Sequence, residues 1–205
     1  MRARDATATK DRILSAATKE FAAKGISGAR IDAIAARART NKRMLYYYFG
    51  SKSELFREVL RTQLTARVTR SREQPTTDRV ERLVERQALH ARDREWVRLL
   101  TWEALESGRQ VPDDGEREQW YRAWVDDLRA AQAAGDVPDD VDAGQLALSE
   151  LALTLFPAAF PQLTRWITGR TVTDPDFVTE RQAFLATVGP RLLSVLGKVE
   201  PSSRS

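Results

Sequence analysis

Apolar residues recur at helical spacing near the start of the chain. Ile13, Ala17 and Phe21 stand four residues apart, so they share one face of a helix predicted over residues 9–24. Gly25 follows this helix, and glycine commonly ends a helix in a left-handed conformation. The pattern therefore predicts an amphipathic first helix that stops at Gly25.

The same spacing continues along the chain, and no segment alternates apolar and polar residues over the length of a strand. The fold class we predict is therefore all-α. Asn41 is a favourable N-cap, and Ser51 with Glu54 forms a capping box. Helices are predicted over 31–38, 42–49, 52–70, 77–92, 94–107, 114–134, 141–165 and 175–197.

The third predicted helix contains three consecutive tyrosines at positions 46–48. Successive residues of a helix turn by about 100°, so these side chains cannot all face one core. Leu45 and Phe49 share the face that we expect to be buried. Tyr47 and Arg43 then point away from that face, where they can contact an anionic surface.

Two short helices, 31–38 and 42–49, are separated only by a tight turn. This is the spacing of a helix-turn-helix, whose second helix enters the DNA major groove. An ordinary helical hairpin with solvated cations is the alternative. The outward tyrosine and the cations at the start of the second helix favour DNA binding.

Charge is distributed unevenly along the 205 residues. Residues 1–52 contain twelve Lys and Arg against four Asp and Glu, whereas the remainder contains 21 against 25. A basic first quarter on a mildly acidic remainder is typical of a protein that binds a polyanion. A solvated basic surface would have the same composition.

Composition also limits the class of protein. There is no cysteine, no P-loop and no GxGxxG, and His90 is the only histidine, so we expect no enzyme, metal or cofactor. An enzyme would have to use His90 or Glu150. The apolar segment 143–160 contains polar residues and a proline, so we expect a buried helix and no membrane span. The expected location is cytoplasmic.

Several motifs of the first sixty residues resemble the TetR family of bacterial transcriptional regulators. They are Phe21 with Gly25, the pair Ile34-Ala35, and the stretch LYYYFGSK from Leu45 to Lys52. The resemblance implies a homodimer that binds a palindromic double-stranded DNA operator. It also implies a repressor released by a small-molecule effector. An effector-independent regulator or an activator is the alternative.

The resemblance also implies which residues contact DNA. We expect Tyr46 and Lys52 on phosphates, and Arg43 and Tyr47 near the bases. A basic arm with Arg2 and Arg4 would reach a minor groove. The full candidate set is Arg30, Arg39, Thr40, Asn41, Lys42, Arg43, Tyr46, Tyr47 and Lys52.

Two residues depart from the family pattern. Arg39 stands in the turn where many members have glycine, which costs about 1 kcal/mol if that turn needs a positive φ. Arg30 stands where a Ser or Thr cap is usual. The hydroxyl contact to phosphate is then absent, and the charge of Arg30 is its replacement.

The body of the chain shows no motif of this kind. We divide the chain into a DNA-binding domain at 1–52, an effector-binding and dimerisation domain at 53–198, and a disordered tail at 199–205. An apolar or aromatic effector is expected, because the body holds candidate pocket residues that are aromatic: Trp96, Trp102, Trp120, Trp124, Phe156 and Phe160. A place in the core or at a dimer interface is the alternative for each of them.

The two last predicted helices, 141–165 and 175–197, are where the resemblance places the dimer contact. One pair from each subunit would make a four-helix bundle. The apolar residues suited to it, or to the core of one subunit, are Leu146, Leu153, Phe156, Phe184, Val188 and Leu192.

Overall fold

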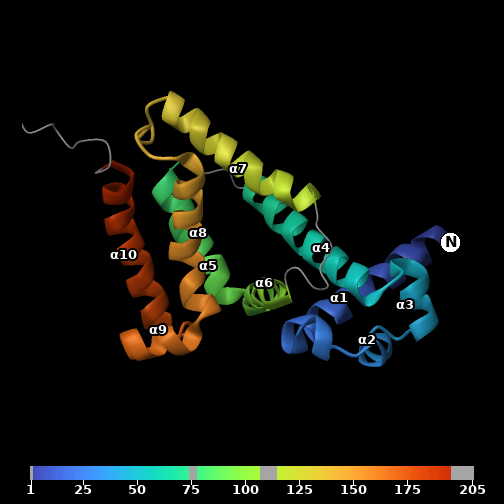
Figure 1. Ribbon diagram of the computed structural model, residues 1–205. Helices are drawn as coiled ribbons and strands as arrows, with labels where there is room; N and C mark the ends of the chain where they lie inside the picture. The colour runs from blue at the N-terminus through green and yellow to red at the C-terminus, as the bar shows by residue number, and fades with distance from the viewer. Residues whose placement is uncertain (1, 74–77, 107–114, 195–205) are drawn as a thin grey trace, which may run out of the picture. The chain divides into compact units, whose positions relative to one another are not determined.

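The computed structural model describes residues 2–73, 78–106 and 115–194, without the side chains of 2–4, 71–73, 116 and 192–194. Every regular element in these ranges is an α-helix, which confirms the predicted fold class (Figure 1). The helices are α1 (Arg2–Gly28), α2 (Ile31–Arg37), α3 (Lys42–Phe49), α4 (Lys52–Glu73), α5 (Arg79–Arg92), α6 (Arg94–Glu106), α7 (Gly115–Ala133), α8 (Ala143–Ala159), α9 (Pro161–Thr168) and α10 (Pro175–Ser194).

The single helix predicted over 141–165 was wrong. It is two helices, α8 and α9, which meet at 88°. Phe160 lies between them with a non-helical backbone (φ −123°, ψ 64°), and Pro161 begins α9. A residue before proline is sterically disfavoured in the helical region, so the chain turns there. Pro157 is tolerated inside the last turn of α8.

The described helices were also compared with the requirements of a membrane span. No one of them is both long enough and apolar enough to cross a bilayer by itself. Only α8 and α9 together meet the criterion of length and composition, and they are sharply bent.

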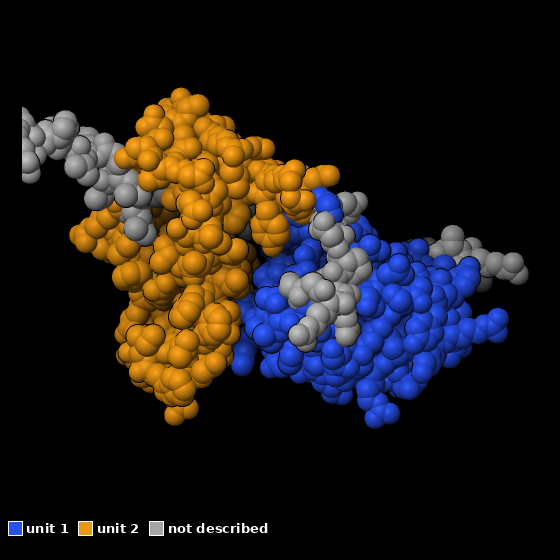
Figure 2. All heavy atoms as spheres, in the orientation of Figure 1, with its two compact units in different colours: residues 1–75, 93–117 blue, residues 76–92, 118–205 orange. Residues whose placement is uncertain are grey.

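The chain forms two compact units (Figure 2). Unit 1 consists of residues 1–75 and 93–117, and unit 2 of residues 76–92 and 118–205. Unit 1 is therefore larger than the predicted DNA-binding domain, because it contains all of α4 and all of α6. The tail at 199–205 lies outside the described residues.

The core of unit 1 forms where α1 packs against α4 and α6. Ile13, Ala17 and Phe21 are completely buried, which confirms the helix face predicted from their spacing. The Phe21 ring meets the Phe56 ring of α4 edge to face at 5.1 Å between centroids. Trp96 of α6 closes the same core.

The first helical stretch of α1 is interrupted at Gly25, where the predicted helix ends, but the backbone of Gly25 is not in the predicted left-handed helical conformation. Its φ is 69° and its ψ is 179°, and a further turn runs to Gly28, so α1 is kinked at this point. A Cβ atom at Gly25 would lie 2.7 Å from two carbons of the Trp102 ring. Glycine is thus required both for the backbone angle and for the close approach of α6.

Unit 2 is built around α5, which packs against both α8 and α10. Leu128 of α7 packs with Ala143 and Ala147 of α8 in a small apolar cluster. The predicted burial of the apolar segment holds for only one face of α8, because its large residues remain accessible. The large apolar residues exposed on α8, α9 and α10, and at Phe160 between α8 and α9, are Leu148, Phe156, Phe160, Trp166, Ile167 and Phe184.

Candidate nucleic-acid interface

The helix α3 presents its aromatic residues as the sequence predicts. Leu45 and Phe49 are buried, and Tyr46 is partly exposed. Tyr47 is 77% exposed. The ring of Tyr48, which packs against the core of unit 1, meets the Tyr47 ring edge to face at 5.3 Å. Tyr47 is therefore an outward aromatic side chain whose ring packs against that of Tyr48.

The turn between α2 and α3 is a Schellman motif. The N–H of Thr40 donates to the carbonyl of Ala35, and the N–H of Arg39 donates to that of Ala36. This motif needs a left-handed residue at the position of Arg39, and the φ of Arg39 is 53°. The turn does require a positive φ, and arginine adopts it. Thr40 is half-buried within the turn.

The start of α3 is fixed by Asn41. Its side-chain oxygen accepts a hydrogen bond from the N–H of Met44 at 3.0 Å, so Asn41 is the N-cap predicted. Lys42 follows, and its ammonium lies 3.6 Å from the carboxylate of Asp32 on α2. Both side chains are exposed, so this pair stabilises the fold by about 1 kcal/mol at most. Lys42 is free to exchange Asp32 for a phosphate.

Glu20 is a residue of this region that was not predicted from the sequence. Arg30 occupies the N-cap position of α2 without a capping side chain. Its N–H donates instead to the carboxylate of Glu20 on α1 at 3.3 Å. In a capping box a glutamate of the same helix takes this N–H, and here α1 supplies the carboxylate.

The Glu20 carboxylate also receives two cations. The ammonium of Lys24 lies 2.8 Å away and the guanidinium of Arg37 lies 3.6 Å away. The hydrogen bond from Lys24 is the main reason why the pKa of Glu20 lies below its usual range, and it outweighs the effect of burial. The sequence does contain a signal for this role, because Glu20 is an acid four residues before Lys24 in an otherwise basic segment.

Lys52 connects the start of α4 with the end of α1. Its ammonium donates to the carbonyl of Ser27 at 3.1 Å, and the Ser27 hydroxyl donates to Glu106 of α6 at 2.7 Å. Burial lowers the pKa of Lys52, and the charge of Glu106 opposes this shift. The ammonium is held in place and keeps further N–H groups for an anion.

Three exposed arginines remain without an anionic partner. Within the described ranges, Arg30, Arg39 and Arg43 form no ion pair, and they lie at the start of α2, in the turn and on α3. A set of uncompensated guanidinium groups beside an outward tyrosine suits phosphates and base edges. For Arg2 and Arg4 the backbone is helical from the start of α1, not an extended arm, and their side chains lie outside the described residues.

The six aromatic residues proposed for a pocket do not gather in one place. Trp96 and Trp102 belong to unit 1, where Trp96 is a core residue and the Trp102 indole donates to the carbonyl of Ala22. In unit 2, Trp124 packs beside Leu128 and Phe160 stacks on Phe156. Half-buried Trp120 is also in unit 2, and of the six only Phe156 lines a described cavity of that unit.

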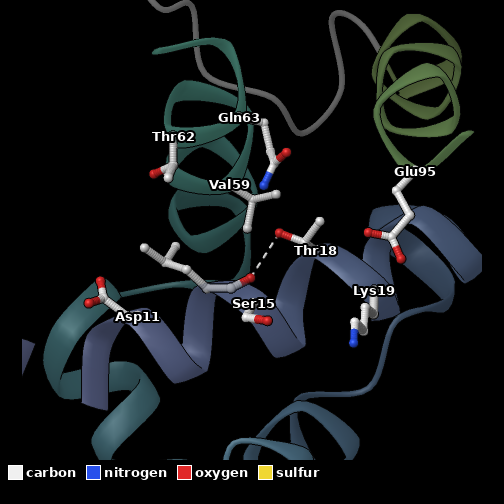
Figure 3. A pocket seen from close by; sticks show the side chains of 9 residues that line it. Asp11, Ser15, Thr18, Lys19, Val59, Thr62, Gln63 and Glu95 are labelled. Carbon is white, nitrogen blue, oxygen red and sulfur yellow. Dashed lines mark hydrogen bonds between the residues drawn. The ribbon is translucent and has the colours of Figure 1, made fainter. Parts of the chain in front are cut away.

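Unit 1 has a small polar hollow of about 290 Å³. Figure 3 shows Thr18 of α1 and Val59 of α4 on its walls, with Glu95 of α6 at one side. The Thr18 hydroxyl donates to the carbonyl of Leu14 at 2.9 Å, so that group already has its partner. The other polar side chains of its wall are Asp11, Ser15, Lys19, Thr62, Gln63 and Glu95.

Two family models match this chain. The model of the tetR family of bacterial regulatory proteins matches residues 13–59, which include α2, the turn and α3. The model of the tetracyclin repressor-like C-terminal domain matches residues 77–188.

Individual proteins match as well. The HTH-type transcriptional repressor SCO4008 of Streptomyces coelicolor is 39% identical over 171 residues, which are 82% of this chain and 88% of that protein. The HTH-type transcriptional repressor NicS of Pseudomonas putida is 52% identical over 60 residues, 29% of this chain and 28% of that protein.

Solved structures share this fold over most of the chain. SCO4942 of Streptomyces coelicolor has a TM-score of 0.75 and 29% identity, covering 91% of this chain and 98% of that one. A structure from Saccharomonospora viridis in complex with choline has a TM-score of 0.61 and 24% identity, covering 87% and 94%. The helix-turn-helix geometry, the two family models and the identity to SCO4008 lead to one conclusion: this chain belongs to the TetR family of DNA-binding transcriptional regulators.

Proposed function

We propose that this regulator is a cytoplasmic homodimeric repressor that binds a palindromic operator and leaves it when a small molecule binds to unit 2. The observation that carries the proposal is the row of uncompensated cations and the exposed tyrosine along α2 and α3. Two such helices related by a two-fold axis would read half-sites about 34 Å apart, one turn of the double helix.

Each DNA contact has a distinct role in this proposal. Arg43 and Tyr47 face the bases from the exposed side of α3, whereas Tyr46 and Lys52 bind phosphates. Arg30 and Arg39 add phosphate contacts at the two ends of α2. Thr40, Asn41 and Lys42 lie at the N-terminus of α3, where backbone N–H groups favour an anion.

A dimer is supported by the apolar residues that α8 and α10 leave exposed. Leu148 is 60% exposed and Phe184 is 44% exposed, and both belong to unit 2. Large apolar patches on a soluble protein usually mark an interaction site. A second copy would cover them in an interface related by two-fold symmetry.

Control by a small molecule is supported by a cavity of about 560 Å³ in unit 2. This volume is within the range of ligand pockets in proteins. The relative from Saccharomonospora viridis, which shares the fold, was solved with choline bound. An effector-independent regulator or an activator would have the same DNA-binding residues, so only ligand binding separates these alternatives.

The experiment is selection from a pool of random duplex DNA by the purified chain, at low and at physiological salt. A palindromic motif and a steep loss of affinity with salt are expected, because phosphate contacts release counterions. Analytical ultracentrifugation of the complex gives the number of chains on each site.

Two outcomes are informative. Two chains on a palindrome would support the dimeric regulator. Salt-dependent binding without an enriched motif would contradict sequence-specific recognition. Transcription in vitro from a promoter that contains the selected motif then separates a repressor from an activator.

A further inference from the structure

The cavity of unit 2 lies where α8 and α10 both pack against α5. Its walls are mostly apolar, and Leu83, Leu153 and Phe156 supply much of them. Its volume of about 560 Å³ suits a molecule with an apolar body. The polar residues of the lining are Arg79, Gln145, Ser149, Glu150 and Arg181.

Glu150 is the one carboxylate in this lining, and it already has a cation. A guanidinium nitrogen of Arg86 lies 3.3 Å from its oxygen. The Arg86 guanidinium also stacks over the Trp124 ring at 4.0 Å. Burial lowers the pKa of Arg86, and Glu150 opposes this shift. The two charges cancel, so neither is left for a ligand.

The positive charge of Arg79 is also partly compensated by nearby groups. Its guanidinium donates to the carbonyl of Asp127 at 3.2 Å. Burial lowers its pKa, while the charges of Glu150, Asp127 and Asp136 act in the opposite direction. Carboxylates therefore lie within electrostatic reach of this arginine.

Arg181 differs, because no carboxylate of the described chain faces it. Burial alone lowers the pKa of its guanidinium. The group donates to the carbonyl of Leu153 at 2.8 Å and stacks 4.9 Å from the Phe184 ring. Its Nε has no acceptor among the described residues. A half-buried cation without an anion is costly, and a bound anion would remove that cost.

Pro157 explains how Arg181 is held. A proline has no N–H, so in α8 it leaves the carbonyl four residues earlier without its helical partner. That carbonyl belongs to Leu153, and Arg181 takes the free position. The free carbonyl of Leu153 therefore holds one edge of the Arg181 guanidinium at the wall of the cavity.

We propose that this cavity binds an organic anion with an apolar body, whose acid group lies against Arg181 while its body fills the space between α8 and α10. The inference rests on the proposed function, because it names the chemical class of the effector. Arg79 lies on the same lining and adds a second, weaker attraction for the acid group.

The test compares three probes that share one apolar body: 4-phenylbutyrate, 4-phenylbutanol and 4-phenylbutylamine. Isothermal titration calorimetry with the full chain measures their binding in the absence of DNA. We expect the acid to bind about tenfold more tightly than the alcohol, because charge-assisted hydrogen bonds in a desolvated site are strong. The amine is expected to bind more weakly than the alcohol.

The variant Arg181→Met removes the charge and keeps much of the side-chain volume. It is expected to remove the preference for the acid over the alcohol. Arg191→Met is the matched control on the same helix, since Arg191 is exposed and does not line the cavity. Pro157→Ala restores an N–H for the carbonyl of Leu153 and is expected to weaken acid binding.

The outcomes separate this inference from the proposed function. Equal binding of acid and alcohol, tighter binding of the amine, or an unchanged preference in Arg181→Met would overturn it. Failure of all three probes to bind a dimeric protein would also overturn it, and would indicate that the second copy fills the cavity. In each case operator binding without ligand, measured on the same sample, tests the regulator independently.

Discussion

At the scale of single residues, Arg39 occupies a left-handed backbone conformation that costs a residue with a Cβ atom about 1 kcal/mol. The end of α7 has the same Schellman hydrogen bonds, from Gly135 and Asp136 to Gln132 and Ala131. There the left-handed residue is Gly135, with φ 78°, which has no side chain to strain. At the end of α2 the left-handed residue is Arg39 instead of glycine, and its cation lies near the predicted DNA-binding surface.

Replacing Arg39 by glycine is expected to stabilise the protein and to weaken operator binding. Relief of the left-handed strain raises the free energy of unfolding by about 1 kcal/mol. Loss of the guanidinium removes one phosphate contact and lowers the salt dependence of binding. Urea denaturation and operator titrations over a range of salt measure the two effects. Arg39→Ala is the control, because it loses the contact and keeps the strain.

Arg43→Ala is expected to act on recognition and not on stability. Its side chain is exposed on α3, so the free energy of unfolding should change by less than about 0.5 kcal/mol. Operator binding should weaken by about 1–3 kcal/mol, with relaxed base preference at one position.

Repeating the selection from random DNA with Arg43→Ala identifies the position. Arg92→Ala, which removes an exposed charge of unit 2, is the control for net charge. Uniform weakening on all sequences would show that Arg43 binds phosphate and not a base.

At the scale of elements, the carboxylate of Glu20 joins α1 to the start of α2. The pKa of Glu20 is lower in the folded protein than in the unfolded chain. The ionised carboxylate therefore stabilises the fold at pH values above the usual pKa of a glutamate, and this stabilisation is lost as the pH falls through the folded-state pKa. Glu20→Gln should therefore lower the free energy of unfolding at neutral pH by about 1–3 kcal/mol.

The pH dependence is the specific readout of Glu20. As the pH falls below about 4.5, the ordinary pKa of a glutamate, the wild type should lose more stability than Glu20→Gln does. Thermal unfolding followed by circular dichroism at several pH values measures the difference. Parallel curves for the two proteins would show that another acid, such as Glu58, controls acid sensitivity.

The close contact between Gly25 of α1 and Trp102 of α6 predicts that a methyl group at position 25 destabilises the protein. Gly25→Ala should destabilise the protein by more than about 1 kcal/mol, because the added carbon meets the Trp102 ring and needs a positive φ. Gly28→Ala is the control, since its added carbon meets only the Cβ of Lys24, at a van der Waals distance of 3.4 Å. If Trp102→Ala reduces the cost of Gly25→Ala in a double-mutant cycle, the two positions are coupled.

The elements also show what sequence reasoning can reach. Local signals, such as Asn41 as a cap or the four-residue spacing of Ile13, Ala17 and Phe21, predicted helices and buried faces correctly. Contacts between distant segments could not be predicted, because no residue near Gly25 in the sequence indicates that Trp102 packs against it. The break at Phe160 was readable from the proline that follows it, and the apolar run around it concealed that signal.

At the scale of the whole molecule, the exposed apolar face of unit 2 has a testable consequence. Leu148→Asp places a charge on this face and should shift a dimer towards monomers, with weaker operator binding because the two half-sites are no longer linked. Sedimentation equilibrium measures the association directly.

The matched control is Leu105→Asp, a substitution of a leucine that is 69% exposed on α6 in unit 1. It adds the same charge at similar exposure outside the proposed interface. A dimer that survives Leu148→Asp unchanged would place the association elsewhere.

The path of the chain between the two units also limits how the protein can be re-engineered. The chain leaves unit 1 after residue 75, returns for residues 93–117 and leaves again, and Trp96 and Leu99 of that returning segment are buried in the core with α1 and α4. A chimera made by one cut after α4 would give the transplanted head a core without these side chains. Exchange of DNA specificity between relatives therefore requires either a graft that carries α6 as well, or substitution of the surface of α3 alone.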